Sequence, residues 1–122
     1  MRTSTKVVIL LITLPGSLAL VGCSRQEPTD ALIGDLDSKS EGDRVRAARL
    51  LQNRTADASK IVPALIKSLD DVDGDVRRSA AIGLGYYGAQ AKEAVPALQE
   101  KQRDSDARVR EAAKIAISRI GG

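Results

Sequence analysis

Hydrophobic residues follow two patterns along the chain, one continuous and one periodic. From Val7 to Val21 the residues are apolar or small and none is charged, whereas beyond about residue 29 apolar residues recur every three or four positions. The last periodic segment places its apolar residues at Val109, Ala112, Ala113, Ala116, Ile117 and Ile120. This spacing predicts an amphipathic helix with one buried stripe. No segment alternates with a period of two, so the sequence predicts helices and no sheet.

The periodic part predicts six helices. They cover residues 29–37, 43–53, 59–69, 75–86, 91–103 and 107–120. Pro63 and Pro96 suit a first helical turn, where an N–H group would have no partner. Asp73 and Asp106 stand where N-cap residues belong, and Gly85 and Gly88 are expected to interrupt the chain after the fourth helix.

The periodic part also repeats itself. Two segments return at one common spacing, Val62 to Leu65 as Val95 to Leu98 and Asp73 to Arg77 as Asp106 to Arg110. The pair Val45-Arg46 precedes Val76-Arg77 by a spacing two residues shorter, so we expect the first unit to be shifted by two residues. A period in this range is typical of stacked helical repeats. Residues 29–122 therefore predict an all-α fold, a short α-solenoid of about 2.5–3 helical hairpins.

The repeated residues resemble the short HEAT-like repeat that also occurs in bilin-lyase-type proteins. That repeat has an acidic loop, Val-Arg, an Ala-rich helix ending in Leu-Gly, a Gly loop and Val-Pro-Ala-Leu. Here it is carried by Asp73, Val76-Arg77, Ala80-Ala81, Leu84-Gly85, Gly88, Ala91, Ala94 and Val95-Pro96-Ala97-Leu98. The signatures of ankyrin and tetratricopeptide repeats, which have similar periods, are absent. The resemblance covers about residues 29–120, and it implies a domain that binds other proteins.

The resemblance also implies a structural ladder along the solenoid. In HEAT-like repeats the Arg of Val-Arg typically bonds a loop Asp of its own or an adjacent unit. Asp73 and Arg77, and likewise Asp106 and Arg110, are four residues apart, a spacing at which such pairs can meet. Arg46 would be the third arginine of the row. Because no partner follows the last predicted helix, we expect that end to pack on another protein or on a second copy.

The N-terminal pattern indicates a secretory signal. Arg2 and Lys6 precede the apolar run, in the order of the n-region and h-region of a signal peptide. An uncleaved anchor would need about 20 apolar residues, and this run is shorter and interrupted by Pro15 and Gly16.

The end of that run resembles the lipobox of bacterial lipoproteins. It reads Leu20-Val21-Gly22-Cys23 and contains the chain's single Cys. The resemblance implies cleavage between Gly22 and Cys23, with the Cys23 thiol carrying the lipid. We therefore expect a cleaved signal peptide at 1–22, a lipidated N-terminus and short linker at 23–28, and the repeat domain after it. Ser24 favours the outer membrane where the organism has two membranes.

Charge and composition argue against several classes of function. Removing Arg2 and Lys6 from the 19 basic residues leaves 17 against 16 acidic residues, a mature net charge of +1. This near balance, together with 2% aromatic residues, argues against nucleic-acid binding. The absence of His excludes catalytic triads, His-liganded metals and the His-dependent iron hydroxylases found among HEAT-like proteins. We expect no catalytic residue, cofactor, metal or small-molecule substrate.

Three further features have a structural and a functional interpretation. Asp71, Asp73 and Asp75 alternate as in a calcium loop, but Val76 and Ile82 replace its Gly and Glu, which favours helix capping. Tyr86 is the best candidate for a partner contact, while its neighbour Tyr87 takes a core position. Leu51, Ile82 and Ile115 each lie six residues after the Val of Val-Arg, and they form either an exposed docking strip or a buried contact between repeats.

These observations predict a non-enzymatic, membrane-anchored lipoprotein that acts as a protein-binding scaffold. Two alternatives stay open. One is an assembly or chaperone-like accessory subunit related to bilin-lyase-type HEAT proteins, and the other is a structural spacer in the cell envelope.

Overall fold

The computed structural model describes residues 26–121. Its α-helices lie in the order α2 (Thr29–Asp35), α3 (Glu41–Leu50), α4 (Ala58–Ser68), α5 (Gly74–Tyr87), α6 (Val95–Lys101) and α7 (Ala107–Gly121). Short 3-10 segments lie between some of the helices, at Leu51–Asn53, Thr55–Asp57 and Gly88–Ala94. Over this part of the chain there are no strands, and the all-α prediction is confirmed.

The helix bounds differ most from expectation between α5 and α6. The expected helix at 91–103 begins at Val95, because Gly88 has a positive φ of 56° and Ala91 is non-helical. Only glycine adopts such a φ without strain, so the chain turns there before the next helix starts.

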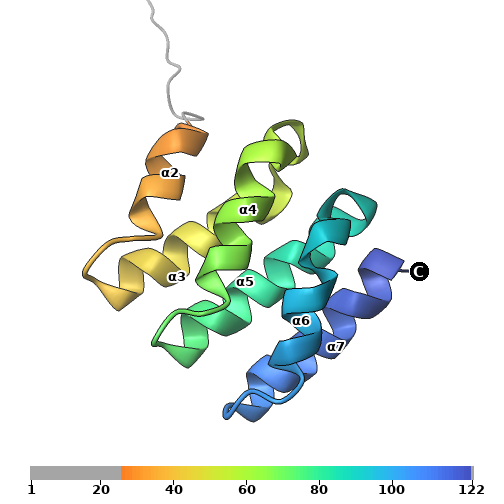
Figure 1. The fold of residues 1–122 in the computed structure, drawn as a ribbon. Helices are drawn as coiled ribbons and strands as arrows, with labels where there is room; N and C mark the ends of the chain where they lie inside the picture. The colour runs from red at the N-terminus through yellow and green to blue at the C-terminus, as the bar shows by residue number, and fades with distance from the viewer. Residues whose placement is uncertain (1–25, 122) are drawn as a thin grey trace, which may run out of the picture.

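The helices form a short solenoid of three hairpins in two layers (Figure 1). Helices α2, α4 and α6 lie in one layer, and α3, α5 and α7 lie behind them in the other. Helices α5 and α7 make the most extensive contact between hairpins. No helix within residues 26–121 has both the length and the apolar character needed to cross a membrane.

Small aliphatic side chains fill the core at equivalent positions of successive units. Leu32, Leu65 and Leu98 are fully buried between the layers, and Ala47, Ala80 and Ala113 are fully buried along the second layer. Alanine at these positions lets neighbouring helices approach closely, which a chain without Phe or Trp requires for a dense core.

The first unit keeps the same register as the later two, which corrects the expected shift of two residues. Arg44, and not Arg46, is the equivalent of Arg77, and the buried Leu51 is the equivalent of the buried Leu84. The Val45-Arg46 pair is a coincidental match. The capping residue marks the true register, because the Ser40 side chain accepts a hydrogen bond from the Asp43 N–H as α3 begins.

The ladder exists, but its arginines pair with the loop of the next unit. The Arg77 guanidinium donates to both carboxylate oxygens of Asp104 at 2.9 and 3.0 Å, and Arg44 does the same to Asp71 at 2.9 and 3.2 Å. Each also donates to a loop carbonyl, as Arg110 does to that of Asp104 at 2.8 Å.

The expected pairs Asp73 with Arg77 and Asp106 with Arg110 are therefore wrong. The carboxylate of Asp73 accepts from the Asp75 N–H at 3.0 Å, and that of Asp106 accepts from the Arg108 N–H at 2.8 Å. Both aspartates serve as helix N-caps, as the sequence predicted, and a capping carboxylate points at the helix end.

The C-terminal face of the solenoid is more polar than the equivalent face of the preceding unit. In the last unit, Gln99, Gln102 and Lys114 take the positions that Ile66, Leu69 and Ala81 hold in the unit before it. The earlier three pack in the core, whereas the later three are exposed. A polar outer face is typical of terminal solenoid units, but Val95 and Ile117 are only partly buried here, whereas the equivalent Val62 and Leu84 are fully buried. The expected packing of this end on another protein or a second copy stays a prediction.

Candidate protein-docking groove

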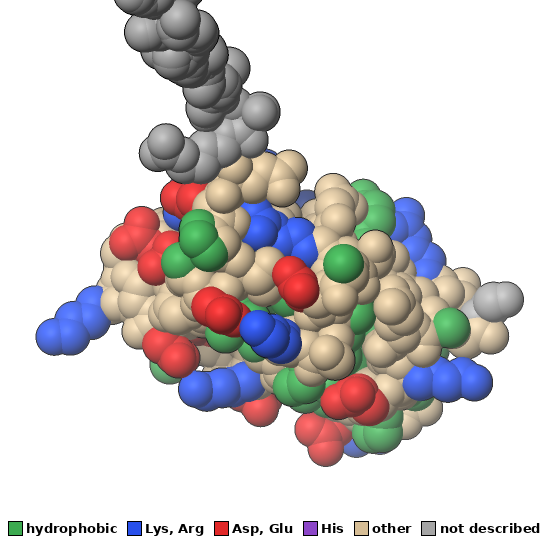
Figure 2. Space-filling model, turned by 90° about the horizontal axis from the view of Figure 1, so that it is seen from above, with side chains coloured by type: hydrophobic (Ala, Val, Ile, Leu, Met, Phe, Trp, Pro, Cys, Tyr) green, Lys and Arg blue, Asp and Glu red, His purple; other side chains and the backbone are tan. Residues whose placement is uncertain are grey.

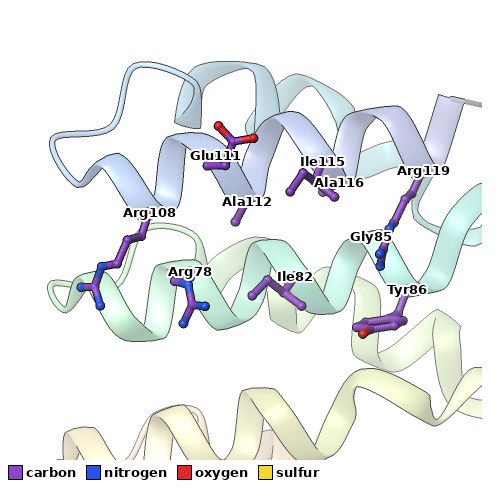
Figure 3. A pocket seen from close by; sticks show the side chains of 10 residues that line it. All are labelled: Arg78, Ile82, Gly85, Tyr86, Arg108, Glu111, Ala112, Ile115, Ala116 and Arg119. Carbon is purple, nitrogen blue, oxygen red and sulfur yellow. The ribbon is translucent and has the colours of Figure 1, made fainter.

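A groove runs along the surface between α5 and α7. Its volume is about 400 Å³. It is lined by Arg78, Ile82, Gly85 and Tyr86 from α5 and by Arg108, Glu111, Ala112, Ile115, Ala116 and Arg119 from α7 (Figure 3). The lining is aliphatic in the middle and charged toward the ends.

The floor of the groove exists because the two helices approach closely through small residues. A Cβ atom at Gly85 would lie 3.1 Å from the Cα of Ala116, so any larger side chain there would require α7 to shift. Ile82 and Ile115 flank this contact, and Ile115 is 47% exposed. Aliphatic side chains are thus left on the surface of an ordered helix pair, where a partner could cover them.

Arginines dominate the rim of the groove. Arg108 pairs with Asp75 at 3.0 Å and with Asp106 at 2.9 Å, and its hydrogen bonds lower the pKa of Asp106 to about 2. The Arg119 guanidinium lies 5.1 Å from the ring centroid of Tyr86, within the range of a cation–π contact. Within residues 26–121, Arg78 and Arg119 form no ion pair.

The two tyrosines separate as predicted. Tyr86 is 52% exposed at one end of the groove, whereas Tyr87 is buried and its hydroxyl donates to the carbonyl oxygen of Leu51. Burial raises the pKa of Tyr87. Tyr86 is therefore placed where a partner could contact it, and its role as an anchor stays a prediction.

The expected aliphatic strip is shorter than the sequence suggested. Ile82 and Ile115 line the groove, but Leu51 is fully buried and belongs to the core. In the register that the structure shows, the third member is Arg49, an exposed residue of α3. The prediction includes Leu51 because it aligns Val45-Arg46 with Val76-Arg77, whereas the true equivalent of Arg77 is Arg44.

A second groove between α3 and α5 is more polar. It has a volume of about 600 Å³, and its lining includes Glu41, Arg49, Asp75 and Arg78. Figure 2 shows basic and acidic side chains interspersed over the face seen from above, which accords with the near balance of charge in the sequence.

The acidic residues proposed for a calcium loop are divided among other tasks. Asp71 pairs with Arg44, and Asp73 caps α5. Glu41 from α3 lies close to Asp73 and Asp75, and a hydrogen bond with Asp73 raises the pKa of Glu41. The contacts of Asp71 and Asp73 accord with the structural interpretation of this loop.

Sequence reasoning missed most of the groove, including Arg78, Glu111 and Arg119. A signal was available, since Arg78, Ile82 and Tyr86 lie four residues apart and so share one face of a helix. The buried stripe of α5 dominates the hydrophobic pattern, so that pattern alone gives no sign of this second face. The predicted lipid-attachment residue Cys23 and its neighbour Gly22 lie outside the described residues.

Comparison with known proteins places the chain in a family. A family model of HEAT repeats matches residues 62–122, half of the chain. The chain belongs to the HEAT repeat family. None of the curated proteins compared with it matches. HEAT repeats are generally scaffolds for protein–protein interaction, and the matched part includes both helices of the groove.

Proposed function

We propose that this HEAT repeat protein is a lipoprotein scaffold of the cell envelope, which binds a partner protein in the groove between α5 and α7. The observation that carries the proposal is an ordered groove with Ile115 and Tyr86 about half exposed on its surface. Exposed aliphatic and aromatic side chains on a rigid surface are typical of protein interfaces.

The rest of the molecule supports a binding role over a catalytic one. The ion pairs that recur along the solenoid hold neighbouring hairpins together, as Arg44 with Asp71 and Arg77 with Asp104. Without His, the chain has no residue whose ordinary pKa lies near neutrality for proton transfer. A non-enzymatic role follows as part of the proposal.

The lipid anchor rests on the Leu20-Val21-Gly22-Cys23 motif. Cys23 lies only six positions before the start of α2 at Thr29, a reach of about 20 Å at ~3.4 Å per extended residue. The scaffold would therefore work close to the lipid surface. Ser24 favours the outer membrane in an organism with two membranes.

The anchor is tested by replacing Cys23 with Ser and fractionating the envelope. We expect the wild-type chain to carry a lipid at its processed N-terminus by mass spectrometry, and the C23S chain to stay unprocessed. An unmodified N-terminus in the wild-type chain would refute the anchor. In a two-membrane organism, Ser24→Asp should move the protein from the outer to the inner membrane.

Partner binding is tested by site-specific photocrosslinking in the native envelope. A photoreactive residue replaces Ile115 in the groove, and the control replaces Val72, an apolar residue that is 92% exposed outside the groove. We expect one envelope protein to crosslink at position 115 and not at position 72. Equal capture at both positions would contradict docking in the groove, and no capture anywhere would favour the structural spacer.

A further inference from the structure

The groove between α5 and α7 carries its charge and its apolar side chains in a fixed order. Along α5, Arg78, Ile82 and Tyr86 are spaced by four residues, and along α7, Ile115 is followed four residues later by Arg119. In Figure 3 the two isoleucines lie in the middle, one on each helix, with Arg78 toward one end and Arg119 beside Tyr86 at the other. An aliphatic centre thus lies between two cationic ends.

The two terminal arginines are available to a ligand. Arg78 and Arg119 are exposed, and within residues 26–121 neither forms an ion pair. Three arginines and one carboxylate, that of Glu111, line the groove. Arg108 is already paired with Asp75 and Asp106, so the positive charge open to a ligand is that of Arg78 and Arg119 at the two ends. Such a surface attracts a complementary acidic partner.

We propose that the groove binds a short protein segment that has aliphatic side chains in its middle and a carboxylate at each end. This inference rests on the proposed scaffold function and specifies the partner. The helix from Arg78 to Tyr86 spans about 12 Å at ~1.5 Å per residue. A helical partner therefore needs acidic residues seven or eight positions apart, and an extended partner needs them about four positions apart.

The order of side chains favours a protein segment over a lipid headgroup. A phosphate group is held by cations gathered at one point, whereas Arg78 and Arg119 lie on either side of the isoleucines. Leu, Ile or Val side chains would cover Ile82 and Ile115 while flanking carboxylates reach the arginines. The apolar contact supplies affinity, and the two charges fix the register of the segment.

The test uses the full chain in lipid nanodiscs and fluorescein-labelled helical peptides. The first peptide has two Glu residues seven positions apart with Leu and Ile between them, and the second has Lys in place of both Glu. We expect anisotropy titrations to give at least tenfold tighter binding of the acidic peptide, which corresponds to about 1.4 kcal/mol. Equal affinity for the two peptides, or no binding of either near ~1 mM, would overturn the proposal.

Charge reversal in the protein provides the second readout. The double variant R78E/R119E should lose its preference for the acidic peptide and prefer the Lys peptide. Arg103→Glu is the control, because Arg103 is exposed outside the groove and forms no ion pair within residues 26–121. An R103E effect as large as that of the double variant would show that net charge alone sets the affinity, which would also overturn the proposal.

The scaffold function and the stated partner chemistry are refuted by different outcomes. If the acidic peptide does not bind but position 115 still crosslinks to an envelope protein, the scaffold function stands and the stated partner chemistry is wrong. Preferential partition of the peptides into empty nanodiscs is measured in parallel. Binding that depends on anionic lipid and not on the protein would assign the interaction to the membrane and refute the groove as the site.

Discussion

Replacing Arg77 with Met should destabilise the solenoid by about 2–3 kcal/mol. The Arg77 side chain is 14% exposed and its partner Asp104 is 6% exposed, so the change leaves a largely buried carboxylate without its main counter-ion. Removing one partner of a fully buried pair costs about 3–5 kcal/mol, and an exposed pair contributes about 1 kcal/mol or less. Asp104 keeps a bond from the Asp106 N–H at 2.9 Å, which places the expected loss between these limits.

Urea unfolding followed by circular dichroism in the far ultraviolet measures this loss, on a form that begins at Ser24. The natural control is Arg78→Met, since the neighbouring arginine is exposed and forms no ion pair within residues 26–121. At a slope of about 1–3 kcal/mol per molar urea, R77M should shift the midpoint by about 1 M or more. R78M should stay within about 0.5 kcal/mol of the wild type.

The coupling between the two residues is the decisive quantity. A double-mutant cycle with Asp104→Asn should give an interaction energy of about 1 kcal/mol or more, because the two side chains share two hydrogen bonds. If R77M and R78M were equally stable, or if the cycle gave no coupling, the ladder would not hold the hairpins together. The recurrence of this arginine in every unit would then need a cause other than pairing with the next loop.

Three other changes test the packing and the electrostatics. Gly85→Leu should cost about 1–3 kcal/mol in thermal and urea unfolding, because its side chain would push the backbone of α7 away. Tyr87→Phe should cost about 1–2 kcal/mol in the same assays, since it removes the buried hydrogen bond that the hydroxyl donates to the carbonyl of Leu51. Desolvation opposes ionisation of Asp104, but the bonds from Arg77 and its other neighbours outweigh it and lower the pKa of Asp104. The pKa of Asp106 is lowered to about 2. Both carboxylates therefore contribute stability that is present above about pH 4 and lost as the pH falls toward about 2. The Tm should fall between pH 5 and pH 2.5, and an unchanged Tm would contradict these pKa directions.

The helices and the core were predictable from local sequence. Periodicity of apolar residues placed all six helices, and the sequence repeat placed Leu65 and Leu98 at equivalent buried positions. These features depend on contacts within a hairpin, and the spacing of apolar residues along the chain shows which helix face makes those contacts. The family match begins at Val62, where the sequence repeat is also clearest.

Contacts between hairpins were harder to predict. The partner of Arg77 is 27 residues away in the next loop, while Asp73 lies one helical turn away and looked equally suitable. The register of the first unit failed for a related reason. Ser40 replaces the capping aspartate found in the later units. Serine and aspartate can both accept the capping hydrogen bond, but a comparison of residue identities does not align them.

The distribution of polar residues favours the groove between α5 and α7 as the proposed surface for a partner. The loops at one end of the hairpins are occupied by the ladder of Arg44 and Arg77 with the following aspartates. The C-terminal face carries Lys114 and two glutamines where the preceding unit is apolar, so a further unit would have to bury those groups. Between α5 and α7, by contrast, the exposed Ile115 can be covered at no such cost, and in the proposed complex the surrounding arginines would select what covers it. The same close packing through Gly85 that joins the last two hairpins also forms the floor of the proposed binding surface, so stability and the proposed recognition would depend on one contact.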